Sequence, residues 1–551
     1  MASAAASPQR EPTPSAPSAP LAAAPSSSIP QKRTLEDVHS PAVSSPLNPE
    51  PKPQKVQLQV PDDGQVMARE KRTKKDSLKK RESKGAPDSS RATPDPKQAE
   101  PQGELAPIRY KLANPKPGDF ELSREPVFAS HHEVQDPEGK TIEFLETSDH
   151  VYNKKNFHYT HCIADPAFPS MFYYRNTEPP PFAAHLSFED TASHMYFDRA
   201  GRHVTSDKGF RMCRANVAVR EGRWYWECKV IRGILKNRGE GDPESHGHVR
   251  VGFARREASL DAPVGFDAYS YGIRDVAGQK VHMSRPKDFF PPGEDIREGD
   301  VIGLEIQLPS ERLQRKIVQG QYNPAIDAAD DGDGDGAPEA PNIIRDRIPI
   351  RFKAHIYFEK IDYHATKELE ELMNPSPMAS GHNAEPPNPN HPAPALRTLP
   401  NSCIRVYKNG LLVGTPWTDL LAFLPPASKQ AQQTGGREAL DDGTLGYYPA
   451  VSVFRGGAVE MNFGPDFWFP PPGPEDTEME GVDGPPRKTT EALRAVAERY
   501  DEQIVEDIVY DIVDEVGFWM QDGGKVIDRS ARDEKAVAPG SEEIKELVQD
   551  D

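Results

Sequence analysis

The chain has 551 residues, enough for several domains, but its 57 prolines and a hydrophobic content of only 36% indicate that much of it does not fold. A formal net charge of −19 argues against a protein whose whole body binds nucleic acid, although it leaves room for a locally basic patch. The cysteines at 162, 213, 228 and 403 form no CxxC pair, which argues against common zinc modules and a disulfide framework and fits a reducing compartment. No apolar run approaches about 18 residues and no signal-peptide core opens the chain, so we expect a soluble intracellular protein with no membrane contact.

Residues 1–104 are rich in proline, serine and alanine and almost free of aromatic residues, which predicts a disordered arm. Within it, residues 69–84 (REKRTKKDSLKKRESK) carry nine basic residues against three acidic ones. This cluster is either a solvated, self-repelling stretch, a nuclear import signal or a sequence-independent contact for DNA phosphates. We favour import, with DNA contact as a second role. The residues expected to serve either role are Lys74, Lys75, Lys79, Lys80 and Arg81.

Residues 105–184 carry aromatic side chains between turn formers, which predicts a folded lead-in of short strands whose role stays open. From His185 onward, strand-like runs follow one another and predict a β-sandwich spanning 185–474. Its later runs are HVRVGFA (248–254), VIGLEIQL (301–308), IPIRFKAHIYFEK (348–360) and CIRVYKNGLLVG (403–414). Long insertions interrupt it near residues 236–246, 309–346, 374–399 and 427–442.

The clearest strand of the chain is WYWECKV, residues 224–230. Trp224, Trp226 and Cys228 fall on one face and polar residues on the other, a period of two that is typical of a half-buried strand. Residues 220–222 (REG) predict a tight turn to a preceding strand that contains Val217 and Val219. Two tryptophans at this spacing bury so much surface that we expect them to nucleate the sandwich.

Two arginines stand out among the strands. Arg250 lies in mid-strand between Val249 and Val251, and Arg274 offers a second cation in the same region. An arginine in this position either forms a structural salt bridge or a solvated face, or it awaits the carboxylates or phosphates of a partner. The residues alone leave both alternatives open.

Short motifs in this region carry little chemistry. Residues 331–336 (DGDGDG) match the first half of a calcium loop, but Asn342 replaces the bidentate glutamate, so we interpret the segment as an acidic linker. Residues 401–403 (NSC) match part of a SET methyltransferase motif without its histidine, and Asn409-Gly410 predicts a type I′ hairpin turn. Without a G-x-S-x-G, HExxH or glycine-rich phosphate loop, we expect no catalytic residue, metal, cofactor or small-molecule substrate.

An acidic, proline-rich linker (475–488) leads to a predicted amphipathic helix over 489–520, followed by a polar tail (521–551). The helix packs back on its own domain or docks in a partner's groove. We favour the groove, because a helix rich in β-branched residues is marginal until its apolar face is buried. The expected docking face consists of Ile504, Val505, Ile508, Val509, Ile512 and Val516.

Several segments in one order carry a resemblance to a known family. They are KGFRM (208–212), WYWE (224–227), RVGF (250–253), LDAPVGFDAYSY (260–271), GDVIG (299–303), YKNG (407–410) and NFGP (462–465). The chain resembles the Ash-two family, the SPRY-domain core subunit of COMPASS-type histone methyltransferase complexes, in a shortened fungal-type form. The resemblance implies an all-β fold, a SPRY (B30.2-like) β-sandwich with long loop insertions, a disordered N-terminal arm and a C-terminal amphipathic helix.

The resemblance also implies a function: a nuclear, non-catalytic scaffold that supports methylation of histone H3 lysine-4 by a SET methyltransferase. It would bridge a WD40 subunit, through an acidic segment of that subunit, and a Dpy-thirty-type dimer, through the last helix. Animal relatives carry tyrosine at the two phenylalanine positions of the WD40 site, so a phenolic hydrogen bond is lost here. The implied WD40-subunit site is Phe210, Arg250, Pro263, Phe266 and Arg274.

The alternative is a SPRY substrate adaptor of a ubiquitin ligase. Such a protein needs a RING, B-box or SOCS-type segment, and the four cysteines speak against the first two.

Overall fold

The computed structural model describes residues 109–111, 114–148, 156–166, 174–236, 247–327, 343–346, 348–352, 355–375, 385–430, 436–437, 440–471, 492–520 and 526–528. The predicted disordered arm 1–104 with its basic cluster, the acidic segment 331–336 and the linker 475–488 lie outside the described residues.

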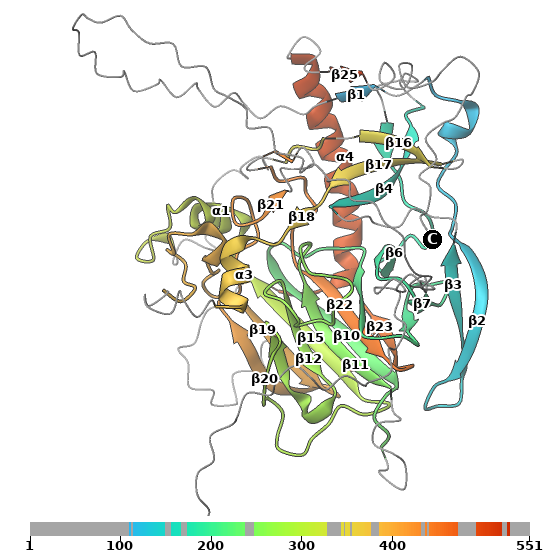
Figure 1. Ribbon diagram of the computed structural model, residues 1–551, viewed down its shortest axis with the longest axis vertical. Coiled ribbons are helices and arrows are strands. Elements are labelled where there is room, and N and C mark those ends of the chain that lie inside the picture. Colours follow the sequence, from blue (N-terminus) through green and yellow to red (C-terminus); the bar gives the residue numbers. More distant parts are fainter. Residues whose placement is uncertain are drawn as a thin grey trace, which may run out of the picture. The chain divides into compact units, whose positions relative to one another are not determined.

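Two antiparallel sheets form the body of the protein (Figure 1). The larger sheet contains, in spatial order, β2 (Val127–Gln135), β3 (Thr141–Ser148), β7 (Tyr196–Phe197), β8 (His203–Thr205), β23 (Ala458–Asn462), β10 (Gly222–Arg232), β15 (Val301–Leu308), β19 (Cys403–Lys408) and β20 (Leu411–Thr418). The smaller sheet contains β14 (Arg285–Lys287), β13 (Lys280–His282), β12 (Ser270–Arg274), β11 (His248–Ala254), β22 (Tyr448–Phe454), β9 (Arg211–Ala215) and β6 (Leu186–Thr191). One further strand, β24 (Leu493–Ala495), pairs in parallel with β10.

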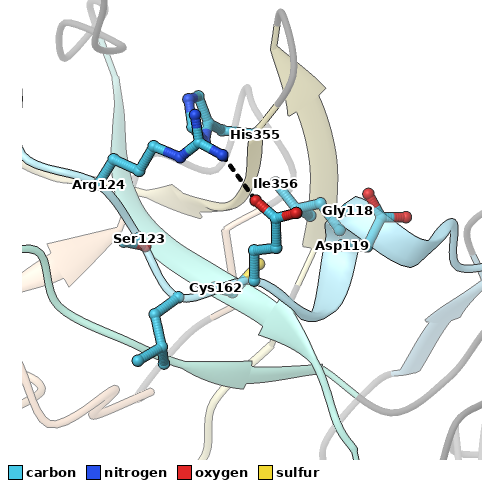
Figure 2. Close-up of a pocket in the computed structure, with 9 residues that line it drawn as sticks. Gly118, Asp119, Ser123, Arg124, Cys162, His355 and Ile356 are labelled. Atoms are coloured by element: carbon cyan, nitrogen blue, oxygen red, sulfur yellow. Dashed lines mark hydrogen bonds and ion pairs between the residues drawn. The ribbon is translucent and has the colours of Figure 1, made fainter.

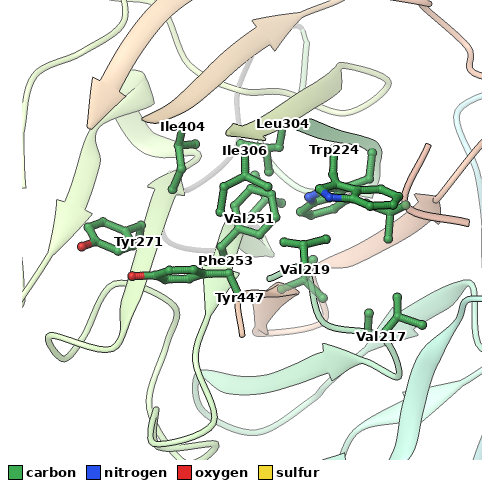
Figure 3. Packing of buried hydrophobic residues seen from close by; sticks show 14 of the residues in the cluster. Val217, Val219, Trp224, Val251, Phe253, Tyr271, Leu304, Ile306, Ile404 and Tyr447 are labelled. Carbon is green, nitrogen blue, oxygen red and sulfur yellow. The ribbon is translucent and has the colours of Figure 1, made fainter. Parts of the chain in front are cut away.

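The core lies between these sheets and is centred on the two predicted tryptophans. Trp226 is fully buried and meets the ring of Phe253 from the smaller sheet edge-on, with centroids 6.0 Å apart. Figure 3 shows side chains of both sheets packed together in this core, among them Trp224, Phe253 and Ile306. This shared core confirms the predicted all-β sandwich.

The strand predicted through Val217 and Val219 does not form; Val219 makes one isolated β-bridge, to Tyr447. β9 ends at Ala215 in the smaller sheet and β10 begins at Gly222 in the larger one, so this segment crosses from sheet to sheet. The crossing is stabilised by burial: Val217 and Val219 are fully buried, and Arg220 forms ion pairs with acids of other segments. A local turn signal cannot distinguish such a crossing from a hairpin, because both need the same backbone bend.

The lead-in is not a separate unit. Its strands β2 and β3 extend the larger sheet, whereas β4 (Phe157–Ala164) and β5 (Tyr174–Asn176) join a four-stranded sheet with β16 (Ile348–Phe352) and β17 (His355–Ile361). We had expected residues 348–360 to belong to the sandwich; they pair with the lead-in instead. We call this four-stranded sheet the satellite sheet. Two short ladders complete the described strands: β1 (Arg109–Lys111) with β25 (Val526–Asp528), and β18 (Tyr363–His364) with β21 (Lys429–Gln430).

Buried charges join the satellite sheet to the sandwich. Arg256, which follows β11, lies 2.9 Å from the carboxylate of Asp190 on β6 and 3.3 Å from that of Asp362, which follows β17. Burial opposes the charged form of Asp362, but Arg256 outweighs it and holds the pKa of Asp362 well below its usual value. This pairing places the satellite sheet against the sandwich.

One helix lies where we expected only an irregular insertion, residues 309–346. α1 (Glu311–Gln319) begins at Ser310, whose hydroxyl accepts a hydrogen bond from the Leu313 amide, and ends at Gly320 in a left-handed conformation. It folds because its apolar side chains, among them Leu313 and Ile317, are buried in the main core. Before the C-terminal helix, the other described helical segments are α3 (Lys367–Met373) and three single-turn segments. These are η1 (Pro117–Phe120), η2 (Val276–Gly278) and η3 (Pro394–Leu396).

The predicted type I′ turn is confirmed between β19 and β20. Asn409 and Gly410 both adopt positive φ, 49° and 81°, and the flanking residues Lys408 and Leu411 pair across the ladder.

His203 on β8 makes stability depend on pH. Its imidazole lies 2.9 Å from the Asp198 carboxylate and 3.6 Å from that of Glu460; burial alone would lower the pKa of His203, but these carboxylates raise it to about 9. Because this pKa exceeds the unfolded value, the stabilisation is full below about pH 6.5 and is lost as the pH rises through 9. We expect His203→Gln to lose on the order of 2 kcal/mol of unfolding free energy near pH 6 and little near pH 10. Urea unfolding of both proteins at both pH values measures the difference, and an equal loss at both would contradict this linkage.

Candidate protein-binding surfaces

The five residues of the implied WD40-subunit site form one surface, which we call the cationic surface: Phe210, Arg250, Pro263, Phe266 and Arg274. Arg250 on β11 and Arg274 on β12 are directly opposed in the antiparallel ladder. Val249 and Val251 point into the core, so Arg250 lies on the outer face of the smaller sheet, and the ladder places Arg274 on the same face.

The environment of Arg250 favours an anion. Its guanidinium lies 4.9 Å from the ring centre of Phe210 and donates a long hydrogen bond, 3.5 Å, to the carbonyl of Val264. Burial and the neighbouring Arg274 lower the pKa of Arg250 to about 10. Among the described residues, neither arginine forms an ion pair with a carboxylate. Asp275 offsets this repulsion only in part, and an incoming carboxylate that pairs directly with the arginines relieves the rest.

A tight turn brings the other two residues of the cationic surface beside Arg250. The amide of Phe266 donates to the carbonyl of Pro263 over 3.0 Å, and Gly265 between them has a φ of 86° that suits glycine. The turn leaves the Phe266 ring 46% exposed, next to the Val264 carbonyl that Arg250 contacts. An exposed ring beside a half-buried cation suits a peptide that carries both apolar and acidic groups.

Sequence reasoning missed three residues that extend this surface: Phe454, Arg455 and His248. The ring of Phe454, at the end of β22, stacks on Phe210 with centroids 4.5 Å apart and an angle of 14°, and Arg455 lies 5.1 Å from the Phe454 ring. His248 pairs with Phe454 across the ladder, and the two rings stack with centroids 6.3 Å apart. In the sequence these residues only mark where two strands begin or end; the cross-strand register brings them together.

The C-terminal helix begins later than expected. α4 spans Val496–Met520, because Leu493–Ala495 forms β24 beside β10 before the helix starts. Its first turns do not lie beyond the sandwich: Val496 and Tyr500 are buried in the main core, and the Ala497 amide donates to the Phe463 carbonyl. Residues 489–491, where we predict the helix to begin, lie outside the described residues.

The rest of α4 turns its aliphatic side chains outward. We call this face the aliphatic stripe; its members are 41–60% exposed, and it includes one residue that our docking face omitted, Val513. The members are Ile504, Val505, Ile508, Val509, Ile512, Val513 and Val516.

The acidic face of α4 points toward the body of the protein. Arg499, buried against the sandwich, donates to the Ala218 carbonyl and forms ion pairs with Glu502 and Glu506 at 3.3 Å and 2.6 Å. An amphipathic helix on a protein surface normally buries its apolar face. The reversed orientation leaves the aliphatic stripe without cover from the described residues.

A small pocket lies between η1 and β17 (Figure 2). It has a volume of about 130 Å³, and its charged groups already have partners: Arg124 pairs with Glu121, and Asp119 accepts a 2.6 Å hydrogen bond from Arg351. In the part of the chain that the structure describes, no cluster of three His, Cys, Asp or Glu residues could hold a metal ion. No described helix is both long and apolar enough to cross a membrane.

Comparison with known proteins supplies the family. No family model matches the chain. The COMPASS component cclA of Colletotrichum higginsianum is 65% identical to it over 96% of both chains, and the COMPASS component cclA of Aspergillus fumigatus is 43% identical over 83% of this chain and 74% of that protein. The Set1 complex component ash2 of Schizosaccharomyces pombe is 37% identical over 75% of this chain and 52% of that protein.

Among solved structures, a human SPRY domain aligns with 50% of this chain and 98% of that domain, at 12% identity and a TM-score of 0.24. The relatives carry the assignment and confirm the resemblance seen in the sequence. The identity to the first of them extends over nearly the whole of both proteins, so the chain belongs to the family of the COMPASS component cclA and the Set1 complex component ash2.

Proposed function

We propose that this chain is a nuclear, non-catalytic scaffold subunit of a COMPASS-type complex and supports methylation of histone H3 lysine-4 by a SET methyltransferase. The observation that carries the proposal is the reversed orientation of α4, whose aliphatic stripe faces outward while its acids face the sandwich. A folded protein rarely exposes a contiguous aliphatic face of this length unless a partner covers it. The names of the relatives, components of COMPASS and Set1 complexes, indicate which assembly supplies the partner.

The aliphatic stripe docks on the Dpy-thirty-type dimer. A helix that lays apolar residues at spacings of three and four into a groove is a standard recognition mode. Each half-exposed isoleucine or valine that becomes buried contributes roughly 1 kcal/mol, about half of a full side-chain burial. Seven such residues are enough for stable binding after the ordering costs are subtracted.

The cationic surface binds an acidic segment of the WD40 subunit. Arg250 and Arg274 supply two adjacent positive charges, and Phe210 and Phe266 supply apolar contact on either side. Charge-assisted hydrogen bonds from arginine to carboxylates are short and strong, and a partly buried site strengthens them further.

The chain then contributes by position alone. Two surfaces on separate elements hold two subunits in a defined geometry, and holding a catalytic subunit in its productive arrangement lowers the reaction barrier without added chemistry. The basic cluster at residues 69–84 serves nuclear import and, as a second role, contact with nucleosomal DNA.

Purification of the tagged full-length protein from native nuclei, with identification of its bound proteins, tests this proposal. We expect a SET methyltransferase, a WD40 subunit and a Dpy-thirty-type subunit in stoichiometric amounts. Recovery of cullin or other ubiquitin-ligase subunits instead would support the substrate-adaptor alternative. Methyl transfer to histone H3 by the purified chain alone would contradict the non-catalytic role.

A further inference from the structure

A single buried arginine, Arg345, forms ion pairs with the acidic face of α4. The side chain of Arg345 is only 2% exposed, and its two terminal nitrogens lie 2.8 Å from the Asp507 carboxylate and 2.6 Å from that of Asp511. It also donates to the Asp507 carbonyl over 2.8 Å, its Nε lies 3.8 Å from Asp514, and its guanidinium lies 5.3 Å from the Tyr510 ring centre. One cation therefore contacts two successive turns of the helix.

Contacts on both sides of Arg345 along the chain fix its backbone. The preceding residue, Ile344, is buried and donates its amide to the carbonyl of Asp441, whose carboxylate lies 2.7 Å from Arg220. Three residues further on, β16 begins and pairs with β17, which pairs in turn with β4 of the lead-in. The satellite sheet and the sandwich thus fix the arginine from both sides, while α4 extends from the sandwich toward the level of β1 and β25 (Figure 1).

Without this contact, the sequence of α4 opposes a stable helix. Residues 501–516 contain seven acids, no lysine or arginine, and seven β-branched residues. β-Branched residues are poor helix formers, and carboxylates spaced by three or four positions repel one another along a helix face. Among the described ion pairs of α4 beyond its first turn, Arg494 and Arg499 offset that repulsion at Glu502 and Glu506, and Arg345 offsets it further along the helix, at Asp507 and Asp511.

We propose that Arg345 is a positioning residue that keeps α4 folded, with the aliphatic stripe exposed, before any partner binds. The same reasoning assigns the lead-in a role: β4 and β5 complete the satellite sheet that holds Arg345 in place. A partner then meets a formed docking face and does not bear the cost of ordering it, which tightens the apparent affinity by the factor by which the folded helix is populated. The effect on affinity rests on the proposed docking of the Dpy-thirty-type dimer; the effect on the helix does not.

Hydrogen exchange of the full-length protein tests the claim that Arg345 keeps α4 folded. In Arg345→Met we expect the amides of residues 504–516 to exchange at least about tenfold faster, while those of β10 keep their protection. Arg345→Lys, which keeps the charge but loses the forked geometry, should restore part of the protection. Arg405→Met is the matched control: Arg405 pairs with Glu305 in the larger sheet, and no described contact links it to α4.

A titration with recombinant Dpy-thirty-type dimer tests the claim that the folded helix aids docking. We expect the dimer to bind Arg345→Met about tenfold more weakly than it binds Arg405→Met. Unchanged exchange in 504–516, or faster exchange spread equally over β10, would overturn the proposal. Faster exchange with unchanged affinity would overturn the claim that the folded helix aids docking. If the wild-type protein itself fails to bind the dimer, the proposed function fails, whereas a local exchange effect would still establish the role of Arg345.

Discussion

Replacing Ile508 with glutamate is expected to weaken binding of the Dpy-thirty-type dimer by more than about a hundredfold. Ile508 lies in the middle of the aliphatic stripe and is 55% exposed, so the change leaves the contacts between α4 and the sandwich intact. Binding then loses the burial of one half-exposed isoleucine, roughly 1 kcal/mol, and must also desolvate a carboxylate inside an apolar groove, which costs several kcal/mol more. The two penalties act on the complex and not on the free protein.

Calorimetric titration of the dimer into both proteins measures this loss, and hydrogen exchange checks that α4 stays folded. Ile326→Glu is the matched control: Ile326 is 57% exposed, and it lies outside α4. We expect that control to bind like the wild-type protein. Co-purification of Ile508→Glu with the dimer would refute the docking role of the aliphatic stripe.

Reversing the charge of both Arg250 and Arg274 to glutamate is expected to weaken binding of the WD40 subunit by at least about thirtyfold. Losing a partly buried charge contact at an interface costs about 2 kcal/mol or more, and two glutamates add repulsion toward an acidic segment. The free protein should tolerate the change, because neither arginine forms an ion pair with a described carboxylate. Reversal also places a glutamate beside the Phe210 ring, where Arg250 makes a cation–π contact.

The control is Arg285→Glu with Lys287→Glu, the same charge change on β14, the exposed outermost strand of the same sheet. It separates a local contact from long-range attraction, since the latter is screened at about 0.15 M salt. Equal weakening by both double variants in that salt would reject the cationic surface as the site. An equal melting temperature of the two variants would exclude misfolding as the cause of any difference.

Local patterns predicted much of the fold. The alternation around Trp224 and Trp226 identified a core strand, and Asn409-Gly410 identified its turn type, because these features depend on residues a few positions apart. The sequence pattern singled out Arg250 and Arg274 as cations among the strands, and in the structure they lie opposite each other in one ladder. The resemblance of ordered motifs to one family added what periodicity cannot supply, a function.

The predictions that were wrong or incomplete share a different cause. The sequence predicts a tight turn between two strands at residues 220–222 and sandwich strands at residues 348–360. In the structure the first segment crosses from one sheet to the other, and the second pairs with β4, almost two hundred positions away. Phe454 joined the cationic surface only through the register of β22. In each case, the partner of a segment depends on which distant strand is available, and that information is absent from any short window.

The sequence by itself determined that the chain contains a β-sandwich core, an amphipathic helix near its end and membership of one family, since burial patterns and motifs are written in neighbouring residues. Only the tertiary structure decided which face of that helix is covered. Hydrophobicity alone would have turned the aliphatic stripe inward, but a buried Arg345, brought from an insertion more than 150 positions earlier, pairs with Asp507 and Asp511 and holds the acidic face inward instead. A buried cation cannot remain unpaired, and this requirement outweighs the burial of the apolar face.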